Sequence, residues 1–272
     1  MMGTSQMEDR GFARRLAEAE RCQFGTWVKM PALETVEMLA NAGFDFIVID
    51  QEHAPLTLAS AYQTIALGQA LGMQVLARVP DRSGSHLQRL LDSGIDGILV
   101  PRVSSVEVAK SVIDQMIFSP QGDRGLGPTS RAGGWGSVSR ADYLKHGDEA
   151  VMHAVQLEDK DVLTEIEDIV GLAGLNGIFL GAGDLGLSSG LPTDAPEISG
   201  LIANMLTVAN RAGIPCGTAV GNAEQALAAA EQGFRYVMIS NDASIFRAAS
   251  ASIMTDVRSK LGESGQATGT AS

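Results

Sequence analysis

The chain contains little cysteine and has more acidic than basic side chains. Only Cys22 and Cys216 occur among 272 residues, and neither belongs to a CxxC pair or lies near a set of metal-ligating residues. This argues against a disulfide framework or a thiolate metal centre, and we expect both thiols to be reduced and buried. The 20 basic residues are outnumbered by 32 acidic ones, and the net charge of -12 argues against nucleic acid or an anionic membrane as a partner.

Long hydrophobic runs are also missing. The first 20 residues lack the apolar stretch of a signal peptide, and no later run reaches the roughly 18 to 20 apolar residues of a membrane helix. We therefore expect a cytoplasmic protein with no membrane partner. Hydrophobic residues make up 45% of the chain, which is ample for a large core, and a length of 272 residues suits a single barrel of roughly 250 residues.

Short apolar runs alternate along the chain with segments of helical periodicity that end in glycine. Runs such as FIVID and GILVP are apolar throughout, as expected for strands covered on both faces. Their number favours a closed (β/α)8 TIM barrel of the α/β class over an open sheet. The eight predicted strands span residues 24–28, 46–50, 74–79, 97–101, 152–157, 177–180, 214–219 and 236–240.

The barrel is predicted to form a single domain over residues 21–261. A helical extension (1–20) precedes it, a tail of disorder-prone composition (262–272) follows it, and a helix over 242–260 comes after the last strand. The segment 119–143 is too rich in Gly, Pro and Ser for a regular element. Because long loops in compact domains are usually functional, we expect this segment to cover the catalytic rim.

Four polar residues each follow a predicted strand, namely His53, Arg78, Glu158 and Asp184. The carboxyl ends of parallel barrel strands share one rim, so these side chains are expected to converge there. Two neighbouring carboxylates need a cation or a shared proton, and oxygen ligands suit Mg²⁺ or Mn²⁺. An acid at a strand end can instead cap the next helix. A lone His can likewise satisfy a backbone carbonyl, and the residues alone leave these alternatives open.

Two other chemistries fit the sequence less well. The stretch GAGDLG at 181–186 matches the GxGxxG pattern of a dinucleotide-binding turn, but it lies two thirds along the chain and the Rossmann fold does not explain eight strands. No lysine ends a predicted strand, and Lys29 and Lys110 are poorly placed for an imine. The sequence therefore favours a metal over a Schiff base.

From about residue 20 to 260, a series of motifs resembles the class II pyruvate aldolases of the HpcH/HpaI type, which include 4-hydroxy-2-oxoheptanedioate and 2-keto-3-deoxy sugar acid aldolases. The resemblance implies a carbon–carbon lyase that reversibly cleaves a 4-hydroxy-2-oxo acid to pyruvate and an aldehyde with a divalent metal. The motifs are GTWVKM, FIVIDQEHAP, VLARVP, RLLDSGIDGILVP, GDRGLG, VQLED and FLGAGDLG.

The resemblance also implies roles for individual residues. Glu158 and Asp184 match the ligands of Mg²⁺, Mn²⁺ or Co²⁺. Arg78 matches the residue that neutralises the developing enolate oxygen. His53 matches the base, acting through a metal-bound water, and Asp92 matches the acid that raises its basicity.

The substrate side of the site is implied in the same way. Gln156 matches a substrate-binding amide, and the backbone at Ala182 and Gly183 matches the turn that binds the pyruvate carboxylate. This chain departs from the family at Ala182, where a proline is common, and at Arg102, where apolar residues are common. We expect Arg102 and the loop arginines Arg124 and Arg131 either to bind an anionic or polyhydroxylated aldehyde or to form surface or interface ion pairs.

The resemblance further implies a homo-oligomer, a hexamer built as a trimer of dimers, in which the last helix packs against a neighbouring subunit. Two other functions remain open: a lyase of the citrate or malyl-CoA type, and a barrel that binds a 2-oxo acid without turnover. The presence of all the polar rim residues disfavours an inactive site. The acidic composition offers no basic groove for a CoA nucleotide.

Overall fold

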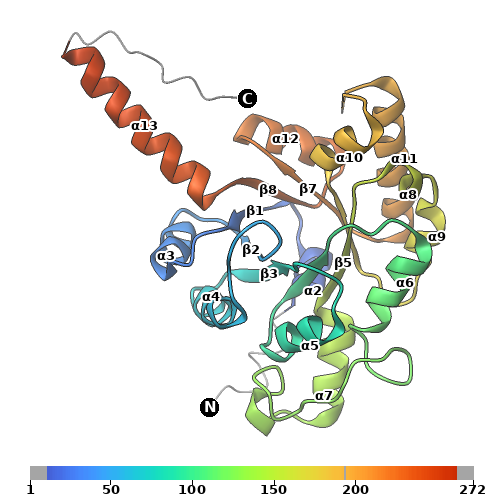
Figure 1. The fold of residues 1–272 in the computed structure, drawn as a ribbon. Helices are drawn as coiled ribbons and strands as arrows, with labels where there is room; N and C mark the ends of the chain where they lie inside the picture. Colours follow the sequence, from blue (N-terminus) through green and yellow to red (C-terminus); the bar gives the residue numbers. More distant parts are fainter. Residues whose placement is uncertain (1–10, 193, 262–272) are drawn as a thin grey trace.

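Eight parallel strands close into one barrel in a computed structural model that describes residues 11–192 and 194–261 (Figure 1). Each strand pairs with the next, and β8 pairs with β1. All eight predicted strands are confirmed, with ends that differ by at most two residues. They are β1 (Gln23–Val28), β2 (Phe46–Asp50), β3 (Gln74–Arg78), β4 (Gly97–Val100), β5 (Met152–Leu157), β6 (Gly177–Leu180), β7 (Cys216–Val220) and β8 (Tyr236–Asn241).

Helices surround this barrel, and several begin where a polar side chain accepts from a free backbone N–H. Thr57, Ser105 and Asn222 each cap a helix in this way. The helices are α2 (Phe12–Glu18), α3 (Leu33–Asn41), α4 (Leu58–Ala70), α5 (Gly84–Asp92), α6 (Val106–Asp114), α7 (Arg140–Lys145), α8 (Lys160–Thr164), α9 (Ile166–Val170), α10 (Ala182–Ser189), α11 (Pro196–Ala212), α12 (Ala223–Gln232) and α13 (Asp242–Lys260). Among the described residues, no helix is long and apolar enough to cross a membrane.

The core has two layers. One fills the space between strands and helices, and the other fills the barrel interior. At the amino-terminal end of the strands, α2 closes the barrel: Phe12 is fully buried, with its ring 4.7 Å from that of Phe46 and 5.6 Å from that of Tyr236. Residues 12–18 of the expected extension therefore pack as part of the barrel. The proposed tail, 262–272, lies outside the described residues.

The segment 119–143 does not cover the catalytic rim, so that expectation is wrong. It joins α6 to β5 and therefore lies at the amino-terminal end of the strands. Its arginines are held there. Arg124 is buried with its guanidinium 4.2 Å from the Phe118 ring centroid, and Arg131 donates to the carbonyl oxygen of Ser93 (2.9 Å). Neither arginine can meet a substrate at the opposite end of its own barrel.

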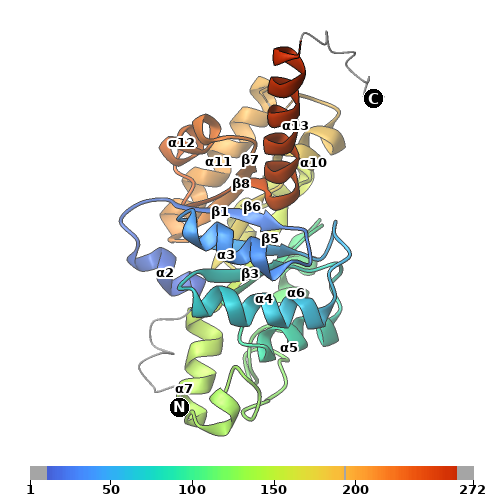
Figure 2. The ribbon, with the colours of Figure 1, turned by 90° about the vertical axis from the view of Figure 1, so that its left-hand side faces the viewer.

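Helix α13 leaves the barrel instead of packing on it (Figures 1 and 2). Its first residue, Asp242, is buried and accepts from the backbone N–H groups of Lys29 and Met30, both at 3.0 Å. Beyond this anchor the helix exposes large apolar side chains, including Phe246 (68% exposed) and Ile253 (63%). Such a stripe needs a covering surface that the barrel of the same chain does not provide.

Both cysteines are free, and Cys216 is buried while Cys22 is partly buried. Burial raises the pKa of the Cys22 thiol to about 11 and that of Cys216 to about 12. The thiols therefore stay protonated near neutral pH and play no part in the chemistry proposed below.

Candidate active site

A cavity of about 370 Å³ lies at the carboxyl end of the barrel, among the segments that follow β2, β4, β5 and β6. His53 follows β2, Glu158 follows β5, and Asp184 lies in the first turn of α10 after β6, so the structure brings together three of the residues singled out in the sequence. Arg102, which follows β4, also lines this cavity. The remaining lining residues are Glu52, Val103, Ser104, Asp159, Leu187 and Ser188.

Arg78 lies behind this cavity in a buried ion-pair network. Its Nε and Nη2 donate to the two carboxylate oxygens of Asp50 at 3.0 and 2.8 Å, and its guanidinium lies 4.3 Å from the centroid of the Trp27 ring. Burial is the largest single influence on the Asp50 carboxyl and opposes its ionisation. Even so, the contacts with Arg78 and Lys29 together lower its pKa. The orientation of the Arg78 guanidinium is therefore fixed before any ligand binds.

The placement expected for Lys29 is wrong. It directly follows β1 at the carboxyl end of the barrel, and its Nζ lies 2.6 Å from Oδ2 of Asp50. The ammonium group is thus engaged by a carboxylate that is itself fully buried. Lys110 lies on the outer helix α6 and pairs with Asp114.

Glu52 lies between two arginines and the histidine of the site. Its Oε2 lies 3.3 Å from Nη1 of Arg78 and 3.6 Å from Nε2 of His53, and its Oε1 accepts from Nε of Arg102 at 3.0 Å. The Glu52 side chain is only 5% exposed, whereas that of His53 is 49% exposed. The backbone N–H of His53 also donates to Asp50 (3.2 Å). The backbone of His53 is therefore anchored by Asp50, while its half-exposed imidazole lines the cavity.

Glu158 and Asp184 do not cap the helices that follow them, which removes the structural alternative left open by the sequence. Asp159 caps α8, and α10 has no side-chain cap. One Glu158 oxygen accepts from the Arg102 backbone N–H (2.9 Å), and the other accepts from the Gln156 amide. Burial raises the pKa of Glu158, and the nearby charges of Asp184 and Glu52 raise it further. The carboxylate pair thus repels itself in the absence of a cation.

The donors at this point suit a hard divalent cation. Alongside the two carboxylates, the buried Oε1 of Gln156 has no hydrogen-bond partner among the described residues. Oxygen ligands of this kind are those preferred by Mg²⁺ and Mn²⁺. Within the part of the chain that the structure describes, no three His, Cys, Asp or Glu side chains group closely enough to hold a metal. An ion bound by Glu158 and Asp184 would need further ligands from substrate and water.

The turn into α10 supplies backbone donors beside the two acids. Ala182 and Gly183 are its first two residues, and N–H groups in a first helical turn have no acceptor within the helix. Gly181 precedes them where a Cβ would lie 2.9 Å from the Glu158 side chain and 3.1 Å from Nε2 of Gln156. Only glycine allows the chain to pass this close to the carboxylate.

Asp92 is not brought to the His53 of its own chain. It ends α5 and precedes β4, so it lies at the amino-terminal end of the barrel. There its Oδ1 lies 3.7 Å from Nη2 of Arg124 and 3.5 Å from the Tyr143 hydroxyl. Within one chain this carboxylate therefore cannot act on the base.

Sequence reasoning missed Glu52, Asp50 as a partner of Arg78, and Lys29 as a residue of the rim. A signal existed for the acids, because IDQEHAP places both directly at a strand end beside the histidine. No sequence pattern indicates that Glu52 pairs with arginines that follow or end two other strands.

Comparison with known proteins agrees with this architecture. Residues 23–249 match the family model described as HpcH/HpaI aldolase/citrate lyase. The hydroxypyruvate/pyruvate aldolase of Sagittula stellata is 28% identical over 229 residues, covering 84% of this chain and 90% of the relative. The 2-keto-3-deoxy-L-rhamnonate aldolase of Escherichia coli is 30% identical over 209 residues, covering 76% of this chain and 77% of the relative.

A solved structure gives the same result. The HpcH/HpaI aldolase/citrate lyase family protein from Burkholderia cenocepacia superposes with a TM-score of 0.82 at 28% identity, covering 91% of this chain and 98% of that protein. The family model spans most of the barrel and reaches into α13. The chain therefore belongs to the HpcH/HpaI aldolase/citrate lyase family of carbon–carbon lyases.

Proposed function

We propose that this protein reversibly cleaves a 4-hydroxy-2-oxo acid into pyruvate and an aldehyde with the help of a divalent metal. The observation that carries the proposal is the arrangement around one cavity: an oxygen-donor set at Glu158 and Asp184, a partly exposed imidazole at His53, and a fixed guanidinium at Arg78 behind Glu52. The two relatives described above, which match most of the chain, bear the names of aldolases.

The residues of the chain can perform the proton and charge movements of this reaction. Cleavage removes the proton of the C4 hydroxyl, breaks the C3–C4 bond and leaves the enolate of pyruvate. His53 faces the cavity and accepts the proton. Arg78 neutralises the negative charge that develops on the enolate oxygen, since Asp50 and Trp27 hold its guanidinium in place. The N–H groups of the α10 turn bind the pyruvate carboxylate.

Glu158 and Asp184 would hold Mg²⁺, Mn²⁺ or Co²⁺, which when bound acts as a Lewis acid toward the keto and carboxylate oxygens of the substrate. Gln156 donates to Glu158 through its amide nitrogen, leaving its oxygen free beside the ion site. Arg102 supports the other oxygen of Glu158 through its backbone. Both contacts orient the carboxylate before a ligand binds.

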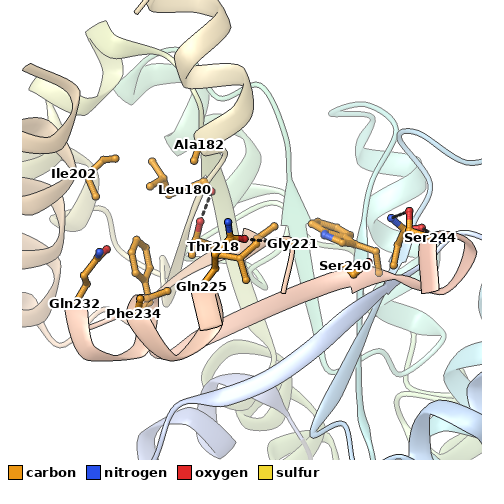
Figure 3. A pocket seen from close by; sticks show the side chains of 16 residues that line it. Leu180, Ala182, Ile202, Thr218, Gly221, Gln225, Gln232, Phe234, Ser240 and Ser244 are labelled. Atoms are coloured by element: carbon orange, nitrogen blue, oxygen red, sulfur yellow. Dashed lines mark hydrogen bonds between the residues drawn. The ribbon is translucent and has the colours of Figure 1, made fainter. Parts of the chain in front are cut away.

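We also propose that the active form is a homo-oligomer, a trimer of dimers. Helix α13 projects away from the barrel (Figure 2), and its large apolar side chains, among them Phe246 and Ile253, are exposed. Beside β7 and β8 lies a cavity of about 740 Å³ whose wall includes Ile202 and Phe234 (Figure 3). An outer helix of a barrel normally covers such a position. In the proposed oligomer, α13 of one copy would cover this cavity wall of another copy.

We propose that Asp92 acts on the base of a second copy. Its side chain is 25% exposed at the amino-terminal end of the barrel, the end opposite to the His53 of its own chain. The role that the family resemblance implies for Asp92 therefore depends on a neighbouring subunit.

Pyruvate and a panel of aldehydes, tested with and without Mn²⁺, provide the experiment. We expect a metal-dependent 4-hydroxy-2-oxo acid product, detected by mass spectrometry, together with the reverse cleavage. If no aldehyde in the panel reacts while the folded protein turns over a CoA thioester, the proposal is wrong and a lyase of the malyl-CoA type takes its place.

A further inference from the structure

We infer that Arg102 selects aldehydes that carry a carboxylate remote from the carbonyl group. The inference deepens the proposed function and rests on it. Of the three arginines that the sequence suggested for an anionic substrate, Arg124 and Arg131 lie at the opposite end of the barrel, and Arg102 alone lines the cavity with His53 and Glu158.

The backbone of Arg102 is held in an unusual conformation at the edge of the acid pair. Its φ of 56° lies in the left-handed region, which is sterically unfavourable for a residue with a Cβ. A glycine would adopt it freely, yet the position carries the longest cationic side chain. The backbone N–H donates to Glu158 (2.9 Å), so the residue is fixed to one of the two proposed metal ligands. A strained residue kept at a site points to a use for its side chain.

The side chain is oriented by one buried acid. Nε of Arg102 donates to Oε1 of Glu52 at 3.0 Å, and the other Glu52 oxygen is engaged by Arg78. Among the described residues, neither terminal nitrogen of Arg102 has an acceptor, and the side chain is 72% exposed at the cavity mouth. The contact from Nε to Glu52 therefore orients the guanidinium, while its two terminal nitrogens remain available to a ligand.

The chemistry of that outer edge suits a planar anion. Two parallel N–H groups of a guanidinium match the two oxygens of a carboxylate. A second exposed guanidinium, that of Arg82, donates to the carbonyl oxygen of Arg102 (3.3 Å) and adds positive charge to the same rim. The carboxylate of Asp159 also lines the cavity, but it accepts from the Asp161 backbone N–H as the cap of α8. The volume of about 370 Å³ accommodates pyruvate and a small aldehyde.

The test compares aldol addition of pyruvate to succinic semialdehyde and to butanal, two four-carbon aldehydes that differ in the terminal carboxylate. The parent protein is compared with two variants. Arg102→Gly removes the side chain while keeping the left-handed backbone and the contact to Glu158. Arg102→Lys keeps a positive charge without the two parallel N–H groups of a guanidinium. Arg211→Gln serves as the matched control, because Arg211 forms an exposed ion pair with Glu167 on the outside of the barrel.

We expect the ratio of kcat/KM for the charged over the neutral aldehyde to fall about tenfold in Arg102→Gly, the lower end for a charge-assisted pair because the guanidinium is largely exposed. Arg102→Lys should fall in between, and Arg211→Gln should keep the parent ratio. An unchanged ratio in Arg102→Gly overturns the inference. Exchange of the pyruvate methyl protons in the parent separates the two proposals: its absence refutes the proposed function, whereas its presence with an unchanged ratio refutes only the role of Arg102.

Discussion

Replacement of Asp50 by Asn should destabilise the barrel by about 3 kcal/mol. The Asp50 carboxylate is fully buried and binds Arg78 through two hydrogen bonds and Lys29 through a third. Removing one partner from a buried ion pair costs about 3 to 5 kcal/mol, since the remaining charge is left without compensation. The lower end applies here because Arg78 retains Glu52 and Trp27, and because the Lys29 side chain is 27% exposed.

The pH dependence of this loss has a definite sign. The pKa of Asp50 is lowered in the folded protein, so its contribution is fully present above the unfolded value near 3.9 and is lost as the pH falls through the folded pKa. The difference in free energy of unfolding between the parent and Asp50→Asn should therefore be largest at neutral pH and shrink below about pH 4.

Urea denaturation monitored by circular dichroism measures both effects. Glu167→Gln is the control, because it removes an ion pair whose two side chains are 74% and 69% exposed, and such pairs contribute about 0 to 1 kcal/mol. If Asp50→Asn lowers the free energy of unfolding at pH 7 by no more than this control does, the ion pairs of Asp50 do not stabilise the barrel as expected.

Three further predictions concern catalysis and assembly. His53→Ala should slow aldol cleavage by about 10² to 10⁴, while pyruvate proton exchange falls less because Arg78 remains; equal losses in both assays would contradict a role as the cleavage base. Gly181→Ala should weaken Mn²⁺ binding in a calorimetric titration, since its Cβ would lie 2.9 Å from Glu158, and unchanged affinity would show that the turn can yield. Phe246→Asp should shift the protein toward a 28.5 kDa monomer in light scattering, and a parent that is already monomeric at micromolar concentration would refute the oligomer.

Strands such as β2 and β4 could be predicted from the sequence because FIVID and GILV are short apolar runs. The shared cavity of His53, Glu158 and Asp184 could also be predicted, because the fold brings all strand ends to one rim. The loop 119–143 lies at the end opposite to the expected one because helix α6, over Val106–Asp114, separates it from β4. One helix between a strand and a loop moves that loop from the catalytic end to the opposite one.

Asp92 illustrates a different limit. It is the last residue of the outer helix α5, and the end of such a helix lies at the amino-terminal end of the strands, so its distance from His53 follows from the topology. Glu52 could not be assigned from the sequence because its partners, Arg78 and Arg102, come from other strands and their pairing depends on side-chain geometry. The left-handed backbone of Arg102 likewise has no sequence signal, because such conformations are expected at glycine.

Exchange of the pyruvate methyl protons with deuterated solvent, followed by NMR, tests the central claim most directly because it needs no aldehyde. After removal of metal with excess chelator, we expect exchange to stop, and Mg²⁺, Mn²⁺ or Co²⁺ to restore it in the parent protein. In Glu158→Gln, added metal should fail to restore the parent rate although circular dichroism shows a folded barrel. Full exchange in excess chelator, or a parent-like rate in Glu158→Gln, would contradict a metal-dependent pyruvate aldolase.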